Sequence, residues 1–123
     1  MGNDKWLSFD EIVEMMNKEG AKMGKIIFDT GYDTLGAKLN GVEYITIPYY
    51  EEEKIVLYKL PTGDAGKVGG LVGLPEDAEF IDKYDTNDEK ENIKIFEQYG
   101  ITDSCEMVYY RMLDIMNNLE KHI

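Results

Sequence analysis

Residues 1–123 are predicted to form one small α+β domain, with an N-terminal helix, a three- to four-stranded, largely antiparallel sheet, and C-terminal helices. Apolar residues recur at helical spacing near both ends of the chain, and short runs of β-forming residues lie between them. Helices and strands that are grouped in this way, rather than alternating, are typical of α+β proteins. The length of 123 residues suits one domain with one hydrophobic core.

The first helix is expected to begin just after Ser8. Ser8 and Glu11 have the spacing of a capping box, in which each side chain accepts a hydrogen bond from the backbone amide of the other. An apolar face follows at helical spacing, formed by Phe9, Ile12, Val13 and Met16. We expect Gly20 to end this helix, because glycine is favoured at the left-handed position that closes many helices.

Four segments are typical of β-strands, namely residues 25–29, 34–39, 42–47 and 54–60. Asn40 and Gly41 separate the second segment from the third. This dipeptide is a strong hairpin signal, because a type I′ turn needs positive φ at both central residues. The glycine-rich stretch 61–75 is too long for an ordinary hairpin connection and is predicted to be a loop.

Helical spacing returns after the loop. A short helix is predicted over residues 75–81, and a second helix is expected to begin at the N-cap Asn87 and to end at Gly100. Thr102 or Asp103 is expected to cap the last helix. That helix carries a long amphipathic stripe, formed by Cys105, Val108, Tyr109, Met112, Ile115, Met116 and Leu119.

Charge is the most informative bulk property of the chain. It has 25 acidic and 13 basic residues and a formal net charge of −12. Residues 76–106 alone hold 11 acids and three lysines, which give −8. Because binding to nucleic acid or to an anionic membrane needs clustered Lys and Arg, we expect neither as a direct partner. A basic protein would instead be attracted to such a surface.

Cysteine and histidine are nearly absent. Cys105 is the only cysteine, which rules out a disulfide within the chain and indicates a reducing compartment, the cytoplasm. The only histidine, His122, lies next to the C-terminal residue and is expected to be a solvated tail. We therefore expect no metal site and no cofactor.

The favoured functional hypothesis is an acidic inhibitor that occupies the basic surface of a partner, such as a nuclease or another nucleic-acid enzyme. Some phage anti-defence proteins and toxin-immunity proteins are inhibitors of this kind. Tyrosines beside carboxylates suit a protein-binding surface, because Tyr offers a large contact area at low entropic cost. The predicted partner-binding residues are Tyr49, Tyr50, Glu51, Glu52, Glu53, Asp82, Asp85, Asp88, Glu89 and Glu91. The sequence is also compatible with a homodimer.

A second hypothesis, from another class, is a module that binds or sequesters a small molecule such as a nucleotide. Successive backbone amides in a glycine-rich loop can form a concave site for an anion. In the loop Gly63–Gly73 the candidate ligand-binding residues are Gly66, Lys67, Gly69 and Gly70. The loop lacks the complete P-loop and dinucleotide-binding patterns.

A third hypothesis is a dimeric aspartic protease. The segment Ile26-Ile27-Phe28-Asp29-Thr30-Gly31 resembles the active-site strand of aspartic proteases. Because the chain has a single Asp-Thr-Gly, it resembles the retropepsins, which work as homodimers. That resemblance implies that Asp29 shares a proton with its counterpart in a second chain. The chain departs from the family in its terminal helices and in lacking a separate apolar-apolar-Gly strand after the glycine-rich segment.

Overall fold

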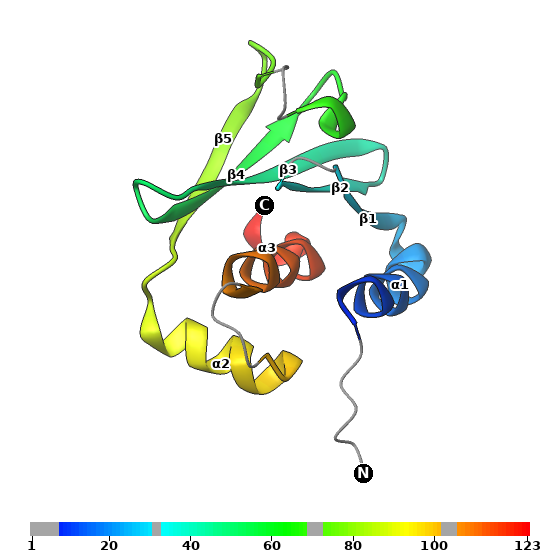
Figure 1. The fold of residues 1–123 in the computed structure, drawn as a ribbon. Helices are drawn as coiled ribbons and strands as arrows, with labels where there is room; N and C mark the ends of the chain where they lie inside the picture. The colour runs from blue at the N-terminus through cyan, green and yellow to red at the C-terminus, as the bar shows by residue number, and fades with distance from the viewer. Residues whose placement is uncertain (1–7, 31–32, 69–72, 102–105) are drawn as a thin grey trace.

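A five-stranded antiparallel sheet, with its strands in sequence order, forms one layer of the fold (Figure 1). The computed structural model describes residues 8–30, 33–68, 73–101 and 106–123. The strands are β1 (Lys25–Asp29), β2 (Leu35–Leu39), β3 (Val42–Tyr49), β4 (Lys54–Leu60) and β5 (Glu79–Asp85). The helices are α1 (Phe9–Gly20), α2 (Glu89–Tyr99), α3 (Met107–Asn117) and α4 (Leu119–His122). The predicted α+β class is thereby confirmed, with five strands in place of three to four.

Helix α3 lies at the centre of the molecule, between the sheet and α2 (Figure 1). Helix α1 packs beside it and against β1, while α2 contacts α3 and lies farther from the sheet. Met112, Leu113 and Met116 of α3 are fully buried. The predicted amphipathic stripe is thus one part of a helix that is buried on most of its surface, because three elements cover it.

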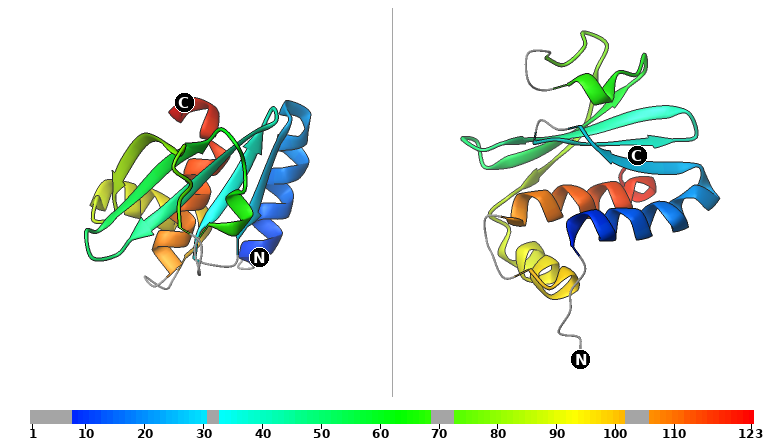
Figure 2. Two further views of the ribbon diagram at one scale, coloured as in Figure 1. Left: turned by 90° about the horizontal axis from the view of Figure 1, so that it is seen from above. Right: turned by 45° about the vertical axis from the view of Figure 1, so that its right-hand side comes forward.

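The 3-10 turn after β4, Ala65–Lys67, lies over the face of the sheet away from the helices (Figure 2). A smaller apolar cluster joins this segment to the sheet. Ile45 and Leu60 are buried there beneath Ala65 and Val68 of the loop that follows β4. The backbone amide of Ala65 donates a 2.8 Å hydrogen bond to a carboxylate oxygen of Glu43. This part of the glycine-rich loop is therefore anchored to the sheet.

The fifth strand corrects the prediction of a short helix over residues 75–81. A register shift lies where β5 meets Leu57 and Tyr58 of β4. Ile81 and Tyr84 consequently both pack against the main core, although they are three residues apart. The bulge interrupts the alternation of inward and outward side chains by which strands are recognised.

Local signals near the turns are largely confirmed. The capping box forms: Ser8 N donates to Glu11 Oε1 at 2.9 Å, and Glu11 N donates to Ser8 Oγ at 3.2 Å. Asn40 and Gly41 have φ of 51° and 85°, as a type I′ turn between β2 and β3 requires. At the ends of α2, Gly100 is left-handed as expected, whereas the N-cap is Asp88, one residue after the predicted Asn87.

The N-terminal helix ends at Gly20 as predicted, but without the expected left-handed conformation at that residue. Gly20 is right-handed, and a short 3-10 turn follows it and closes at the left-handed Gly24. A Cβ on Gly20 would lie 2.9 Å from the carbonyl oxygen of Lys25, so glycine permits β1 to pass close to the helix. The predicted caps of the last helix, Thr102 and Asp103, and its first stripe residue, Cys105, lie outside the described residues.

The outer edge of β1 is closed by a side chain from α1. The Ile27 amide donates to Asn17 Oδ1 at 2.7 Å, and the Asn17 amide donates to the Ile27 carbonyl at 2.9 Å. The side-chain amide thus takes the place of a neighbouring strand, which protects an otherwise exposed sheet edge. In the described part of the chain, no helix is long and apolar enough to span a membrane.

We predict that Met116→Ala lowers the free energy of unfolding by about 2–5 kcal/mol, because the substitution leaves a cavity in the packed core. Met15 provides a matched control on α1, since its side chain is 55% exposed. Met15→Ala should change the same quantity by less than about 0.5 kcal/mol. Urea titration measures both, and a similarly small loss for Met116→Ala would contradict its burial.

Candidate functional site

Acidic side chains from distant segments gather at one end of the sheet. In an antiparallel meander, the β1–β2 connection, the β3–β4 turn and the end of β5 lie at the same end of the sheet. We call this surface the acidic end, and it comprises Asp29, Asp33, Glu51, Glu52, Glu53, Asp85, Asp88, Glu89 and Glu106. All nine are exposed. Apart from Asp29, none of them forms an ion pair within the part of the chain that the structure describes.

Hydrogen bonds join the two predicted acidic runs at this end. The backbone amide of Thr86 donates to the carbonyl of Glu53 at 2.9 Å, and the Asn87 side chain donates to the Glu53 carboxylate. Glu53 has a positive φ of 55°, which allows the tight β3–β4 turn to close. The turn and the start of α2 are therefore held side by side, so their carboxylates form one continuous surface.

Tyrosines border the carboxylates. The Tyr109 hydroxyl donates a 2.6 Å hydrogen bond to Asp33, and that bond, together with burial, raises the pKa of Tyr109. Tyr50 is 59% exposed; partial burial raises its pKa, and the charge of nearby Asp33 adds to this effect. These rings offer apolar contact area within a charged surface, the combination that favours protein recognition.

The Tyr49 side chain, in contrast, packs on residues of the neighbouring strand β4. Its hydroxyl lies 3.1 Å from that of Tyr58, and its ring lies 5.5 Å from Lys54 Nζ. Burial, followed by the hydrogen bond with Tyr58, raises the pKa of Tyr49 to about 12. In the pair Tyr49-Tyr50, one ring thus packs on the protein and the other faces solvent.

Two of the predicted partner-binding residues do not join the acidic end. Asp82 lies in the middle of β5, opposite Leu57, and is exposed. Glu91 is partly buried on α2 and lies 3.7 Å from Lys94. The remaining predicted carboxylates, Glu51, Glu52, Glu53, Asp85, Asp88 and Glu89, all belong to it.

Sequence reasoning missed the part of the acidic end beside β1. Asp33 and Glu106 are isolated acids in the sequence, and Tyr109 was expected on the core stripe of the last helix. The structure brings them together because the N-terminal end of α3 lies beside the end of β1. No local pattern marks this contact, which joins residues 76 positions apart in the chain.

Only part of the predicted ligand-binding loop falls within the described residues. Gly66 is exposed in the 3-10 turn Ala65–Lys67. Ala65 in this turn and Val68 just after it are buried on the sheet. Gly69 and Gly70 lie outside the described residues, and the Lys67 side chain is not described.

The Asp29-Thr30 segment ends β1 as expected. Asp29 is the last residue of the strand, and the Thr30 amide then donates to the Thr34 carbonyl at 3.3 Å across the β1–β2 connection. Asp29 also borders a small hollow of about 200 Å³ together with Phe9, Glu106 and Tyr109. The other acidic residue in the lining of that hollow is Glu106, the N-cap of α3.

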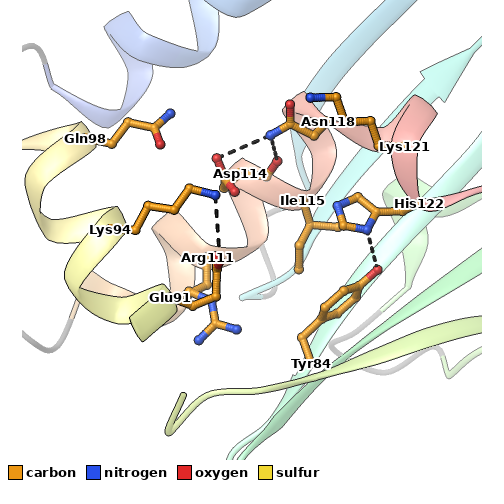
Figure 3. A pocket seen from close by; sticks show the side chains of 10 residues that line it. All are labelled: Tyr84, Glu91, Lys94, Gln98, Arg111, Asp114, Ile115, Asn118, Lys121 and His122. Atoms are coloured by element: carbon orange, nitrogen blue, oxygen red, sulfur yellow. Dashed lines mark hydrogen bonds and ion pairs between the residues drawn. The ribbon is translucent and has the colours of Figure 1, made fainter. Parts of the chain in front are cut away.

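A second polar site, a cavity, was not predicted from the sequence. A cavity of about 520 Å³ lies among β5, α2, α3 and α4 (Figure 3). Its charged or titratable lining consists of Tyr84, Glu91, Lys94, Arg111, Asp114, Lys121 and His122. His122 was expected to be a solvated tail, but its Nδ1 lies 2.9 Å from the Tyr84 hydroxyl and its ring meets the Tyr84 ring edge-on.

Two charged residues of the central helix line this cavity. Arg111 and Asp114 are 5% and 9% exposed, respectively. The sequence did contain a signal for them, because Arg111 is the only arginine in the chain and lies with Asp114 within a strongly apolar helix. Charged residues are rarely so buried without a partner.

No protein-family model matches the chain, and no curated protein or solved structure shows significant similarity to it. Function is therefore inferred from the geometry of the chain itself.

The tyrosines predict a loss of stability at alkaline pH. Tyr49 and Tyr84 have pKa values raised to about 12, against a value of 10.0 for an unperturbed tyrosine. Because the folded state holds these protons more tightly, their contribution to stability is complete below pH 10 and is lost as pH rises through 12. Urea titrations at rising pH should show this fall, and Tyr49→Phe should reduce it; an unchanged pH dependence in that variant would contradict the assignment.

Proposed function

We propose that this protein is a non-catalytic inhibitor that binds the basic, nucleic-acid-binding surface of another protein through its acidic end. The observation that carries the proposal is the convergence of nine exposed carboxylates from the β1–β2 connection, the β3–β4 turn, the β5–α2 junction and the start of α3. Because eight of them lack a cation partner among the described residues, their charge is available to an incoming surface.

Carboxylates at this density can occupy positions that phosphates take on a nucleic-acid enzyme. Complementary charge steers the encounter and raises the association rate, and salt weakens this effect strongly. Tyr50 and Tyr109 add ring surface beside Asp33, and aromatic residues of this kind often dominate binding energy. The hydrogen bonds that hold the β3–β4 turn beside the start of α2 limit the conformational entropy lost on binding.

The proposed partner is a nuclease or another enzyme whose groove binds nucleic acid. An inhibitor of this type suits a phage anti-defence protein or the immunity partner of a nuclease toxin. Such a complex would form in the cytoplasm, the compartment that the cysteine content favours.

We predict that the double substitution Glu51→Lys and Glu52→Lys leaves the fold intact and abolishes capture of the partner. The immobilised protein is incubated with an extract of its source cells, and the main captured protein is identified. Capture should fall steeply between low and high salt. A DNA or RNA oligonucleotide should displace the partner, because both would compete for one basic groove.

The control is the double substitution Glu14→Lys and Glu97→Lys, which makes the same change in net charge at exposed sites outside the acidic end. It should retain most of the capture at moderate salt. Equal loss in both variants would mean that only overall charge matters. A partner that binds equally well at high salt, or that no oligonucleotide displaces, would overturn the proposed function.

A further inference from the structure

The cavity among β5, α2, α3 and α4 is lined by a buried cation, Arg111, that forms no ion pair with any described residue. Arg111 is 5% exposed, and its guanidinium donates one hydrogen bond, at 2.8 Å, to Asn92 Oδ1. Within the described residues this is its single hydrogen bond, and it forms no ion pair there. Most of the guanidinium donors therefore remain for whatever occupies the cavity that Arg111 lines (Figure 3).

The nearest candidate carboxylate on the same helix is already engaged. Asp114 accepts hydrogen bonds from the Tyr99 hydroxyl at 3.0 Å and from the Asn118 side chain at 3.4 Å. Asp114 and Arg111 are three positions apart on α3, yet they form no ion pair. An unpaired charge is costly to bury, so an anion that completes the site would stabilise the protein.

Further positive groups line the same cavity. Lys94 lies 3.7 Å from Glu91, which is a long separation for an ion pair, and its side chain is 58% exposed. Lys121 is exposed on α4, and His122 approaches from the same short helix. The cavity thus combines one deep guanidinium with accessible cations nearer to solvent, in a chain whose net charge is −12.

We propose that this cavity binds a small anionic molecule that carries a phosphate or carboxylate group, and that the Arg111 guanidinium binds that group. A planar guanidinium suits either group, because its parallel N–H donors match two oxygens of the anion. The volume of about 520 Å³ suits a small organic molecule. Lys94 and Lys121 would bind further oxygens of the same ligand near the mouth of the cavity. This site is separate from the acidic end and does not depend on the proposed inhibitor function.

Calorimetric titration and thermal shift test the proposal on the full chain. The probes are inorganic phosphate, adenosine monophosphate and succinate, and uncharged adenosine is the control ligand. We expect at least one anionic probe to bind and to raise the melting temperature, whereas adenosine does neither. Binding of phosphate compounds alone would assign the ligand to that class, and binding of succinate alone would assign it to the carboxylates.

Variants then locate the site. Arg111→Met should weaken binding of the active probe by about 10- to 100-fold, because a charged hydrogen-bonding group is lost. Lys94→Gln should weaken binding less, and its exposed position protects the fold. The matched control is Lys90→Gln, an equal charge change on the same helix at an exposed residue that does not line the cavity. It should leave binding unchanged.

Three outcomes would overturn the proposal: no binding of any anionic probe at millimolar concentration, wild-type affinity in Arg111→Met, or equal weakening by Lys90→Gln and Lys94→Gln. If circular dichroism shows that Arg111→Met does not fold, the comparison of Lys94→Gln with Lys90→Gln decides the question. Partner capture through the acidic end should be normal in Lys94→Gln, which separates a failure of this proposal from a failure of the proposed function.

Discussion

The burial of α3 between the sheet, α1 and α2 is the constraint on which the rest of the structure depends. A helix covered on so many sides needs hydrogen-bond partners for most of the polar groups that it carries. Tyr99 and Asn118 supply hydrogen bonds to Asp114, and Asn92 supplies one to Arg111. These contacts fix how α2 and the chain after α3 lie against the helix.

The C-terminal end of α3 is satisfied in the same way. Lys25 of β1 is 2% exposed, and its ammonium donates to the Asn117 carbonyl at 2.6 Å and to Glu120 at 2.8 Å. The positive charge meets the negative end of the helix dipole. The side chain also links the first strand to the last two helices, so residues from both ends of the chain define one core.

Signals that act within a few residues could be recognised in the sequence. The capping box at Ser8, the Asn40-Gly41 turn and the left-handed Gly100 depend on backbone geometry that neighbouring residues impose. Strand β5 was missed because its pairing with β4 crosses the whole glycine-rich loop and contains a bulge.

The candidate sites show the same difference. Each acidic run could be recognised from the sequence alone. That the runs form one surface depends on the order of the strands in the sheet. The role of Asp33 and Tyr109 depends on a contact between the β1–β2 connection and α3, which no periodicity encodes. Arg111 is the one arginine of the chain, but its burial depends on the position of α2, which no local pattern predicts.

The two candidate sites have opposite electrostatic requirements within one small chain. The acidic end acts at long range, where the field of the whole protein attracts cations and salt screens it. The cavity must attract an anion against that same field. Its affinity must therefore come from short-range contacts in a region of low dielectric constant, where a deep guanidinium is most effective.

The side-chain amide of Asn17 on Ile27 has a consequence for self-association. Because that amide occupies the backbone groups of Ile27 at the edge of β1, an incoming strand cannot pair there without displacing α1. Growth of the described sheet is thereby directed to β5, whose end lies within the acidic end. Strand β5 itself carries exposed Glu79, Asp82 and Asp85 against one lysine, Lys83. Two copies that met through β5 would therefore bring like charges together, and their repulsion disfavours a continuous intermolecular sheet. Geometry thus protects one edge against aggregation, and charge protects the other.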